Sequence, residues 1–328
     1  MSEFRSPDWI WINGAVVPWA DACVHVYSET ATRGANVFEG IRAYWHEETR
    51  EYYTLFLSEH LRRLYQSAKL LRFPTTVTAT ELAEGMIQLL RALDYGEHVY
   101  LRPTIYVNDS RGQGVGATDV STGVYAVCFP APRPGGTVGI RCGVSTWRRP
   151  GDLTLSPRIK SGAGFLNFRL ARVEAAERGF DDMIMLNERD TVAEATSANI
   201  FIVRSGVAIT PPVTVGLLEG VTRARLLRLL PDTLNVPVVE REIGRTELYA
   251  ADEIFLCSTL QEIRPVLQID GFQVGDGVPG PVTSRVRELY LQRCEAGPHA
   301  PPGWLYRMST APSERPGLLG RASISGSR

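Results

Sequence analysis

The chain has 328 residues, of which 44% are hydrophobic and 22% charged, a composition typical of a globular protein with two domains. Its net charge of −1 lacks the basic excess that binds nucleic acids or anionic membranes, so we expect neither as a partner. No apolar stretch approaches the length of a membrane span, and five scattered cysteines favour a reducing cytoplasm without a disulfide framework or a metal site.

The first part of the chain is predicted to contain strands, then two helices, then two more strands. Leu61, Leu64 and Ala68 recur at helical spacing and mark one apolar stripe. We expect strands at 9–12 and 15–18, helices at 58–72 and 79–94, and strands at 99–107 and 123–129.

A segment rich in proline and glycine divides the chain. Residues 129–136 hold three prolines and two glycines, which cannot continue a helix or a central strand. We therefore expect an N-terminal α/β domain over 1–129, a linker over 130–136 and a C-terminal domain over 137–308. Residues 309–328 lack an apolar period and are expected to form a disordered tail.

The second part mixes single helices with runs of strands, so the chain as a whole is predicted to have an α+β fold. We expect a strand at 138–145, a helix after Lys160 to about Gly179, strands at 183–186, 200–203 and 207–210, a helix at 220–230 and a strand at 253–257.

Lysine is scarce, because only Lys69 and Lys160 stand among the 35 basic residues. Lys69 falls on the polar face of helix 58–72, which predicts a solvated side chain. Lys160 precedes the small residues Ser161-Gly162-Ala163-Gly164, which leave room around its amine. A deprotonated lysine can form a Schiff base with an aldehyde cofactor, and a tight, partly dry site favours deprotonation. Lys160 is therefore the candidate catalytic residue, although a solvated loop lysine also fits the local sequence.

Three further features could belong to the same site. Glu194 lies between apolar segments, where a buried carboxylate needs a cation or hydrogen-bond donors; a surface turn is the alternative. Gly220 opens a helix whose amides at Val221 and Thr222 would bind an anion, although many helices begin this way. Arg63 could fork onto a phosphate or form a surface ion pair.

Together these are the groups that a pyridoxal phosphate enzyme needs. An amine bonds the aldehyde, a carboxylate keeps the pyridine nitrogen protonated, and a cradle holds the phosphate. The protonated ring accepts the electrons released when the substrate Cα–H bond breaks, and the lysine amine moves the proton.

The chain resembles the fold-type IV pyridoxal phosphate aminotransferases, and among them the branched-chain amino acid aminotransferases, over about residues 9–306. Several motifs in the same order carry the resemblance. They are residues 36–44, Arg63-Leu64 with Ser67-Ala68-Lys69, Tyr100-Leu101-Arg102-Pro103, Lys160, residues 191–201 around Glu194, Gly220-Val221-Thr222-Arg223 and Ser258-Thr259-Leu260-Gln261-Glu262.

The resemblance implies a two-domain homodimer that transfers an amino group between an amino acid and a 2-oxo acid by a ping-pong mechanism. It implies that Lys160 bonds pyridoxal 5'-phosphate and that Glu194 contacts the ring nitrogen. The implied phosphate ligands are Arg63, Val221, Thr222 and Thr259. The implied substrate side holds Phe38, Tyr100, Arg102, Ser258 and Leu260, and residues 112–116 would reach the neighbouring subunit.

Two residues depart from the usual pattern of the family, which has tyrosine at both positions. Phe165 cannot offer a hydroxyl to the phenolic oxygen of the cofactor. Arg33 borders the pocket for the substrate side chain, and a guanidinium does not suit a purely aliphatic group. We therefore expect a substrate more polar than leucine, isoleucine or valine, unless Arg33 turns outward to a surface acid.

Other functions share these residues. A D-amino acid or amine transaminase, or an aminodeoxychorismate-type lyase, would use the same Lys160 and Glu194, whereas the motif over 38–44 favours the branched-chain-like group. A non-catalytic protein that kept the fold is a further alternative, which the intact Lys160 and Glu194 oppose.

Overall fold

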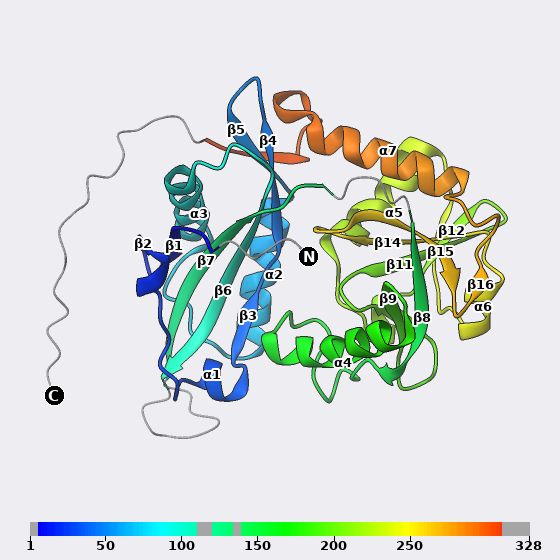
Figure 1. Ribbon diagram of the computed structural model, residues 1–328, viewed down its shortest axis with the longest axis horizontal. Helices are drawn as coiled ribbons and strands as arrows, with labels where there is room; N and C mark the ends of the chain where they lie inside the picture. Colours follow the sequence, from blue (N-terminus) through cyan, green and yellow to red (C-terminus); the bar gives the residue numbers. More distant parts are fainter. Residues whose placement is uncertain (1–5, 110–119, 134–138, 310–328) are drawn as a thin grey trace, which may run out of the picture.

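Two β-sheets lie side by side in the computed structural model, which describes residues 6–109, 120–133 and 139–309 (Figure 1). The first sheet contains eight strands, and its neighbouring strands are antiparallel. Its strands are β1 (Trp9–Ile12), β2 (Ala15–Pro18), β3 (Asn36–Phe38), β4 (Ile41–His46), β5 (Glu51–Leu55), β6 (Val99–Asp109), β7 (Ser121–Pro130) and β17 (Leu305–Met308).

Two amphipathic helices, α2 (Leu57–Leu70) and α3 (Ala79–Leu93), pack their apolar stripes on the first sheet. The stripe of α2 is buried as its spacing predicts, and Lys69 on the opposite face is exposed. The helix α3 begins with a capping box, in which Thr78 and Glu81 each bind the backbone amide of the other. The short helix α1 (Glu29–Arg33) precedes β3.

The second sheet contains nine strands and is mixed, because β8 runs parallel to β9 and β15, and β12 runs parallel to β13. Its strands are β8 (Ile140–Arg148), β9 (Asp182–Leu186), β10 (Val192–Ala195), β11 (Asn199–Arg204), β12 (Val207–Thr210), β13 (Val238–Glu240), β14 (Glu253–Ser258), β15 (Glu262–Ile269) and β16 (Phe272–Gln273).

Helices cover this second sheet from two sides. The helix α4 (Gly162–Arg178) packs on β8 and β9, and the helices α5 (Val221–Leu234) and α7 (Pro281–Glu295) pack on β14. Figure 1 shows α4 and α7 along opposite borders of the second sheet. The remaining helices are α6 (Arg245–Tyr249) and the 3₁₀ turns Trp19–Asp21, Val213–Val215 and Gly297–His299.

The mixture of antiparallel sheet, mixed sheet and helices confirms the predicted α+β class. One strand departs from the expected domain boundaries. β17 pairs with β5 of the first sheet although the sequence placed it in the C-terminal part, because Met308 buries its side chain in the first core. The rest of the proposed division at 129 and 136 stays a prediction. The loop 112–116, part of the linker and the tail from residue 310 lie outside the described residues.

Candidate active site

Lys160 lies where the two sheets meet. Its carbonyl accepts a hydrogen bond from the Phe38 amide (3.0 Å), and its own amide donates to Ser67 Oγ (3.2 Å). The next residue, Ser161, forms a β-bridge with Val37 and caps α4 by accepting from the Gly164 amide. Contacts from β3, α2 and α4 therefore fix the backbone that carries the Lys160 side chain.

The amine of Lys160 lies beside two aromatic rings that pack on each other. Its Nζ is 5.0 Å from the centre of the Phe38 ring and 4.9 Å from the centre of the Phe165 ring. Burial lowers the pKa of this amine from 10.5 to about 8, with Arg63 adding to the effect and Glu39 opposing it. A large share of the amine is therefore neutral near pH 8, which is the form that can bond an aldehyde.

Glu194 is a buried carboxylate in β10, so the alternative of a surface turn is wrong. The register between β10 and β9 shifts between Val192 and Glu194, and such a bulge re-aims a side chain. Glu194 Oε1 lies 3.0 Å from Arg149 Nε and accepts from the Leu218 amide (3.1 Å), while Oε2 accepts from Asn199 Nδ2 (3.1 Å). Burial raises the pKa of Glu194, and Arg149 with the Leu218 amide opposes that rise.

The start of α5 offers backbone amides without a side-chain cap. Gly220 is its N-cap residue and has no side chain to accept from the first turn, which also contains no acidic residue. Val221 and Thr222 are buried there. The N-terminus of a helix carries free N–H groups and a partial positive charge, so it suits an anion such as a phosphate.

Arg63 forms a bidentate ion pair with the buried carboxylate of Glu39, so the alternative of a surface ion pair is wrong. Its Nε donates to Glu39 Oε1 (2.6 Å) and its Nη2 to Glu39 Oε2 (2.9 Å). Its Nη1 donates to the carbonyl of Glu219, directly before α5 (2.7 Å). His60 Nδ1 lies 2.8 Å from Glu39, and its other ring nitrogen lies 3.3 Å from Thr259 Oγ1. Arg63 and Thr259 are thus joined by one network.

Sequence reasoning missed Glu39 and His60 as members of this network. A signal for Glu39 was present, because a carboxylate between Phe38 and Gly40 interrupts an apolar stretch that continues into Ile41. A signal for His60 was also present, because helical spacing places it on the apolar stripe with Leu57, Leu61 and Leu64.

Phe38 and Arg102, both expected on the substrate side, lie near the Lys160 amine, and Tyr100 precedes Arg102 on the same strand. Tyr100 and Arg102 are two apart on β6 and so point to the same face. The guanidinium carbon of Arg102 lies 3.8 Å from the centre of the Phe38 ring. A Cβ at Gly40 would lie 2.4 Å from the Tyr100 hydroxyl, so only glycine leaves room for this ring.

The turn after β14 is held from both sheets. The Leu260 carbonyl accepts from Arg42 Nη1 (3.1 Å), and Ser258 Oγ accepts from the Gln261 amide (3.3 Å). Thr259 between them reaches His60. Leu260 itself exposes about half of its side chain.

The two departures from the family pattern differ in their surroundings. Phe165 packs edge to face on Phe38, with ring centres 4.9 Å apart. Arg33 is exposed at the end of α1, next to Gly34, which lies against Ala163 at the start of α4. Among the described residues Arg33 forms no hydrogen bond or ion pair. Its exposure gives the more polar pocket no support, and that pocket stays a prediction.

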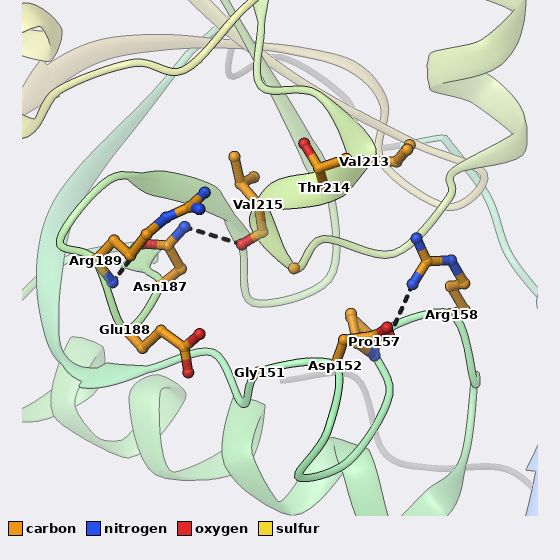
Figure 2. Close-up of a pocket in the computed structure, with 11 residues that line it drawn as sticks. Gly151, Asp152, Pro157, Arg158, Asn187, Glu188, Arg189, Val213, Thr214 and Val215 are labelled. Atoms are coloured by element: carbon orange, nitrogen blue, oxygen red, sulfur yellow. Dashed lines mark hydrogen bonds and ion pairs between the residues drawn. The ribbon is translucent and has the colours of Figure 1, made fainter.

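A separate cavity of about 240 Å³ lies beside the loops at Gly151 and Val215 (Figure 2). Arg158 and Asp152, which line it, form an ion pair (2.7 Å), and Asn187 Nδ2 donates to the Val215 carbonyl (3.0 Å). The residues that line it in the described part of the chain include none of the predicted site residues. This cavity is therefore distinct from the surroundings of Lys160.

The described residues contain neither a metal-binding cluster nor a membrane-spanning helix. No group of three or more His, Cys, Asp or Glu in this part of the chain is placed to hold a metal ion. In the same residues, every helix is too short or too polar to cross a membrane.

Comparison with known proteins shows the family to which the chain is similar. The model of the family described as amino-transferase class IV matches residues 36–269. A probable branched-chain-amino-acid aminotransferase of Aquifex aeolicus is 38% identical over 89% of this chain and 94% of that protein. The branched-chain-amino-acid aminotransferase of Escherichia coli K12 is 36% identical over 92% of this chain and 97% of its own.

A solved structure with a similar sequence has the same fold as this chain. The crystal structure of the branched-chain amino acid aminotransferase from Thermobaculum terrenum, in its PLP form, superposes with a TM-score of 0.86 at 36% identity, covering 92% of this chain and 99% of that one.

Proposed function

Because the chain belongs to the class IV aminotransferase family and is therefore a pyridoxal phosphate-dependent aminotransferase, we propose that Lys160 carries the cofactor. The observation that carries this proposal is the setting of the Lys160 amine. It lies beside the rings of Phe38 and Phe165 with its pKa lowered to about 8, whereas Lys69 is exposed on α2. Lys160 and Lys69 are the two lysines of the chain.

The described residues fit each end of the cofactor. The uncapped start of α5 and the guanidinium of Arg63 would hold its phosphate, with Thr259 nearby. Glu194 would accept a hydrogen bond from the protonated ring nitrogen, and Arg149 favours the anionic form of Glu194.

Each of these side chains would have one task in the proposed reaction. Bound pyridoxal phosphate would supply an electron-withdrawing ring that makes the substrate Cα–H acidic. The amine of Lys160, freed when the substrate amine takes its place on the cofactor, would remove the Cα proton and hold it for return. Glu194 keeps the ring nitrogen protonated while this proton moves. Phe38 and Phe165 exclude water from the Lys160 amine.

We propose a branched-chain amino acid and a 2-oxo acid as the substrates, since the relatives reported above are named for branched-chain amino acids. The rings of Phe38 and Phe165 support an apolar side chain near the amine. Another solved branched-chain amino acid aminotransferase, 33% identical to this chain, is complexed with N-(5'-phosphopyridoxyl)-L-glutamate, so L-glutamate is proposed as the second amino acid. We further propose that the enzyme is a cytoplasmic homodimer in which residues 112–116 reach the neighbouring subunit.

Borohydride reduction of the enzyme with its cofactor tests the assignment of Lys160. The stable adduct should map by peptide mass to Lys160, and Lys160→Ala should lose both the visible absorbance of bound cofactor and turnover. Lys69→Ala is the matched control and should keep both. An adduct on Lys69, or an active Lys160→Ala variant, would overturn the proposal.

A further inference from the structure

The carboxylate of Glu39 collects four hydrogen bonds in the interior, and the proposed reaction assigns it no task. It follows β3 and is fully buried. Arg63 donates to both of its oxygens, and His60 Nδ1 and the Gly40 amide bind Oε2 at 2.8 and 3.2 Å. Arg63 and His60 hold the pKa of the Glu39 carboxyl well below its usual range despite the burial that raises it. Glu39 is thus a permanent buried anion.

The two partners of Glu39 connect it to two proposed phosphate ligands. Arg63 is one of these ligands itself, and His60 contacts the other, Thr259. Arg63 uses three of its five N–H donors on Glu39 and the Glu219 carbonyl, which leaves two donors beside the start of α5. His60 presents its second ring nitrogen to Thr259 Oγ1, 3.3 Å away on the other sheet. A single carboxylate therefore fixes an arginine from α2 and, through a histidine, a threonine from the turn after β14.

We propose that Glu39 is a positioning residue that pre-organises the phosphate-binding end of the site, through Arg63 on one arm and His60 with Thr259 on the other. This inference rests on the proposed function, because it assumes a phosphate at the start of α5. An arginine has many rotamers, and a ligand that must order it binds more weakly than one that meets it already in place. Glu39 removes that cost before the cofactor arrives.

A merely structural Glu39 would behave differently. If it only neutralised Arg63 and His60 in the core, its loss would loosen the whole site and would weaken every ligand alike. A positioning role toward phosphate weakens ligands that carry a phosphate and spares those that do not. Pyridoxal, which has the same ring and aldehyde as pyridoxal phosphate, separates the two cases.

The experiment compares the Kd values of pyridoxal phosphate and pyridoxal for the full-length apoenzyme and its Glu39→Gln variant, by absorbance titration. Glutamine keeps the size of the side chain but loses the charge and one acceptor. We expect the Kd of pyridoxal phosphate to rise about tenfold or more, as for weakened charge-assisted hydrogen bonds, and that of pyridoxal to change less than about twofold. An equal loss for both ligands, or no loss for either, would overturn the inference.

His60→Asn keeps the test decisive if Glu39→Gln does not fold. The asparagine amide can donate to Glu39 as Nδ1 does, but it has no atom that reaches Thr259. We expect a loss selective for the phosphate, smaller than that of Glu39→Gln because the Arg63 arm remains. A Kd ratio of the two ligands that stays at the wild-type value contradicts the two-arm arrangement.

Wild-type enzyme separates this inference from the proposed function. If borohydride fixes no cofactor to Lys160 of the wild type, the proposed function fails. If the wild type binds the cofactor at Lys160 and the variants show no selective loss for pyridoxal phosphate, the role of Glu39 fails alone.

Discussion

At the scale of single residues, the two lysines of the chain differ in their surroundings, because the Lys160 amine lies beside two aromatic rings whereas Lys69 is exposed on α2. The scarcity of lysine singled out Lys160 in the sequence, and its attachment to the cofactor stays a prediction. Glu194 was predictable because its neighbours are apolar, and the structure places it inside. The contacts of Glu39 and His60 were not, because Glu39 binds Arg63 of α2 and His60 reaches Thr259 in the turn after β14. Such a contact has no local pattern.

The lowered pKa of Lys160 predicts how cofactor attachment depends on pH. The amine bonds an aldehyde only when neutral, so attachment should speed up as the pH rises and should level off above about 8. Unphosphorylated pyridoxal is the better probe, because a phosphate ionises at a pH of about 6 on its own account. The rate of the absorbance change on attachment of pyridoxal, measured at a series of pH values, gives the midpoint, which is the pH at which half of the amine is neutral. A midpoint near 10.5, the ordinary lysine value, would show that the rings of Phe38 and Phe165 do not desolvate the amine.

Glu194→Gln should lower turnover far more than stability. A neutral amide cannot hold a proton on the ring nitrogen, so turnover should fall by about 10² or more, the size seen when a preorganised electrostatic partner is removed. The free energy of unfolding should fall by only about 1–3 kcal/mol, because the amide still accepts a hydrogen bond.

The matched control for this change is Glu174→Gln. Glu174 is another buried glutamate, which lies on α4 and accepts hydrogen bonds from Ser145 and Thr146 of β8 and from Arg178. The Glu174→Gln variant should lose about as much stability as Glu194→Gln but should keep the turnover of the wild type. Half-reaction rates measure the loss of turnover in both variants, and urea denaturation measures their loss of stability. Equal turnover in the two variants would show that Glu194 does not hold the ring proton.

Arg33→Tyr tests which substrates the enzyme accepts. Because Arg33 is exposed, we expect the ratio of leucine turnover to glutamate turnover to change less than about threefold, as for a surface substitution. A kcat/KM panel over several amino acids measures this ratio. A larger gain for leucine, with a loss for polar substrates, would show that Arg33 borders the pocket after all.

At the scale of elements, periodic segments were the predictable ones. The helices α2 and α3 were predicted within two residues of their ends, because apolar positions recur along one face. The strands β4 and β5 were not predicted. Most of their residues are buried on both faces, and they include buried Arg42 and Glu51, so they show no alternation. The helix α7 was also missed, although Pro281 at its first position is a start signal.

The start of α5 supplies a prediction at this scale. A Cβ at Gly220 would lie 1.9 Å from Asn199 Oδ1, the side chain whose amide binds Glu194 and the Leu218 carbonyl. Gly220→Ala should therefore displace Asn199 and weaken cofactor binding at both ends, by about tenfold in Kd for one lost buried hydrogen bond.

Gly244→Ala is a matched control for this substitution. Gly244 is also an N-cap glycine with an extended backbone, at the start of α6, and its added Cβ would meet nothing within 4 Å. We expect its cofactor Kd to equal that of the wild type. If Gly220→Ala binds the cofactor equally well, the close approach of Asn199 is not needed for the site.

At the scale of the whole molecule, the sequence predicted two parts but not how they are joined. β17 returns from the end of the chain to pair with β5, about 250 residues away by its register (Tyr306 with Thr54). The bridge between Val37 and Ser161 joins the first sheet to the start of α4. Pairings at such separations cannot be read from local periodicity, because each strand carries a pattern that fits many partners.

Arg42 joins the same two parts through polar contacts in the interior. Its Nη1 donates to the Leu260 carbonyl (3.1 Å), its Nη2 to the Ala131 carbonyl (2.6 Å), and its Nε lies 3.6 Å from Glu262 Oε1. Arg42→Met fills a similar volume but leaves the Leu260 and Ala131 carbonyls without this donor, whereas Glu262 keeps its contacts with Tyr44 and Arg133. We expect the free energy of unfolding to fall by about 1–3 kcal/mol, the cost of leaving partly buried acceptors unpaired. Arg189→Met is the matched control, because Arg189 pairs with Glu242 on the surface and should contribute about 1 kcal/mol or less. Urea denaturation compares the two, and if Arg42→Met costs no more than Arg189→Met, the two sheets are held together by their apolar contacts rather than by this arginine.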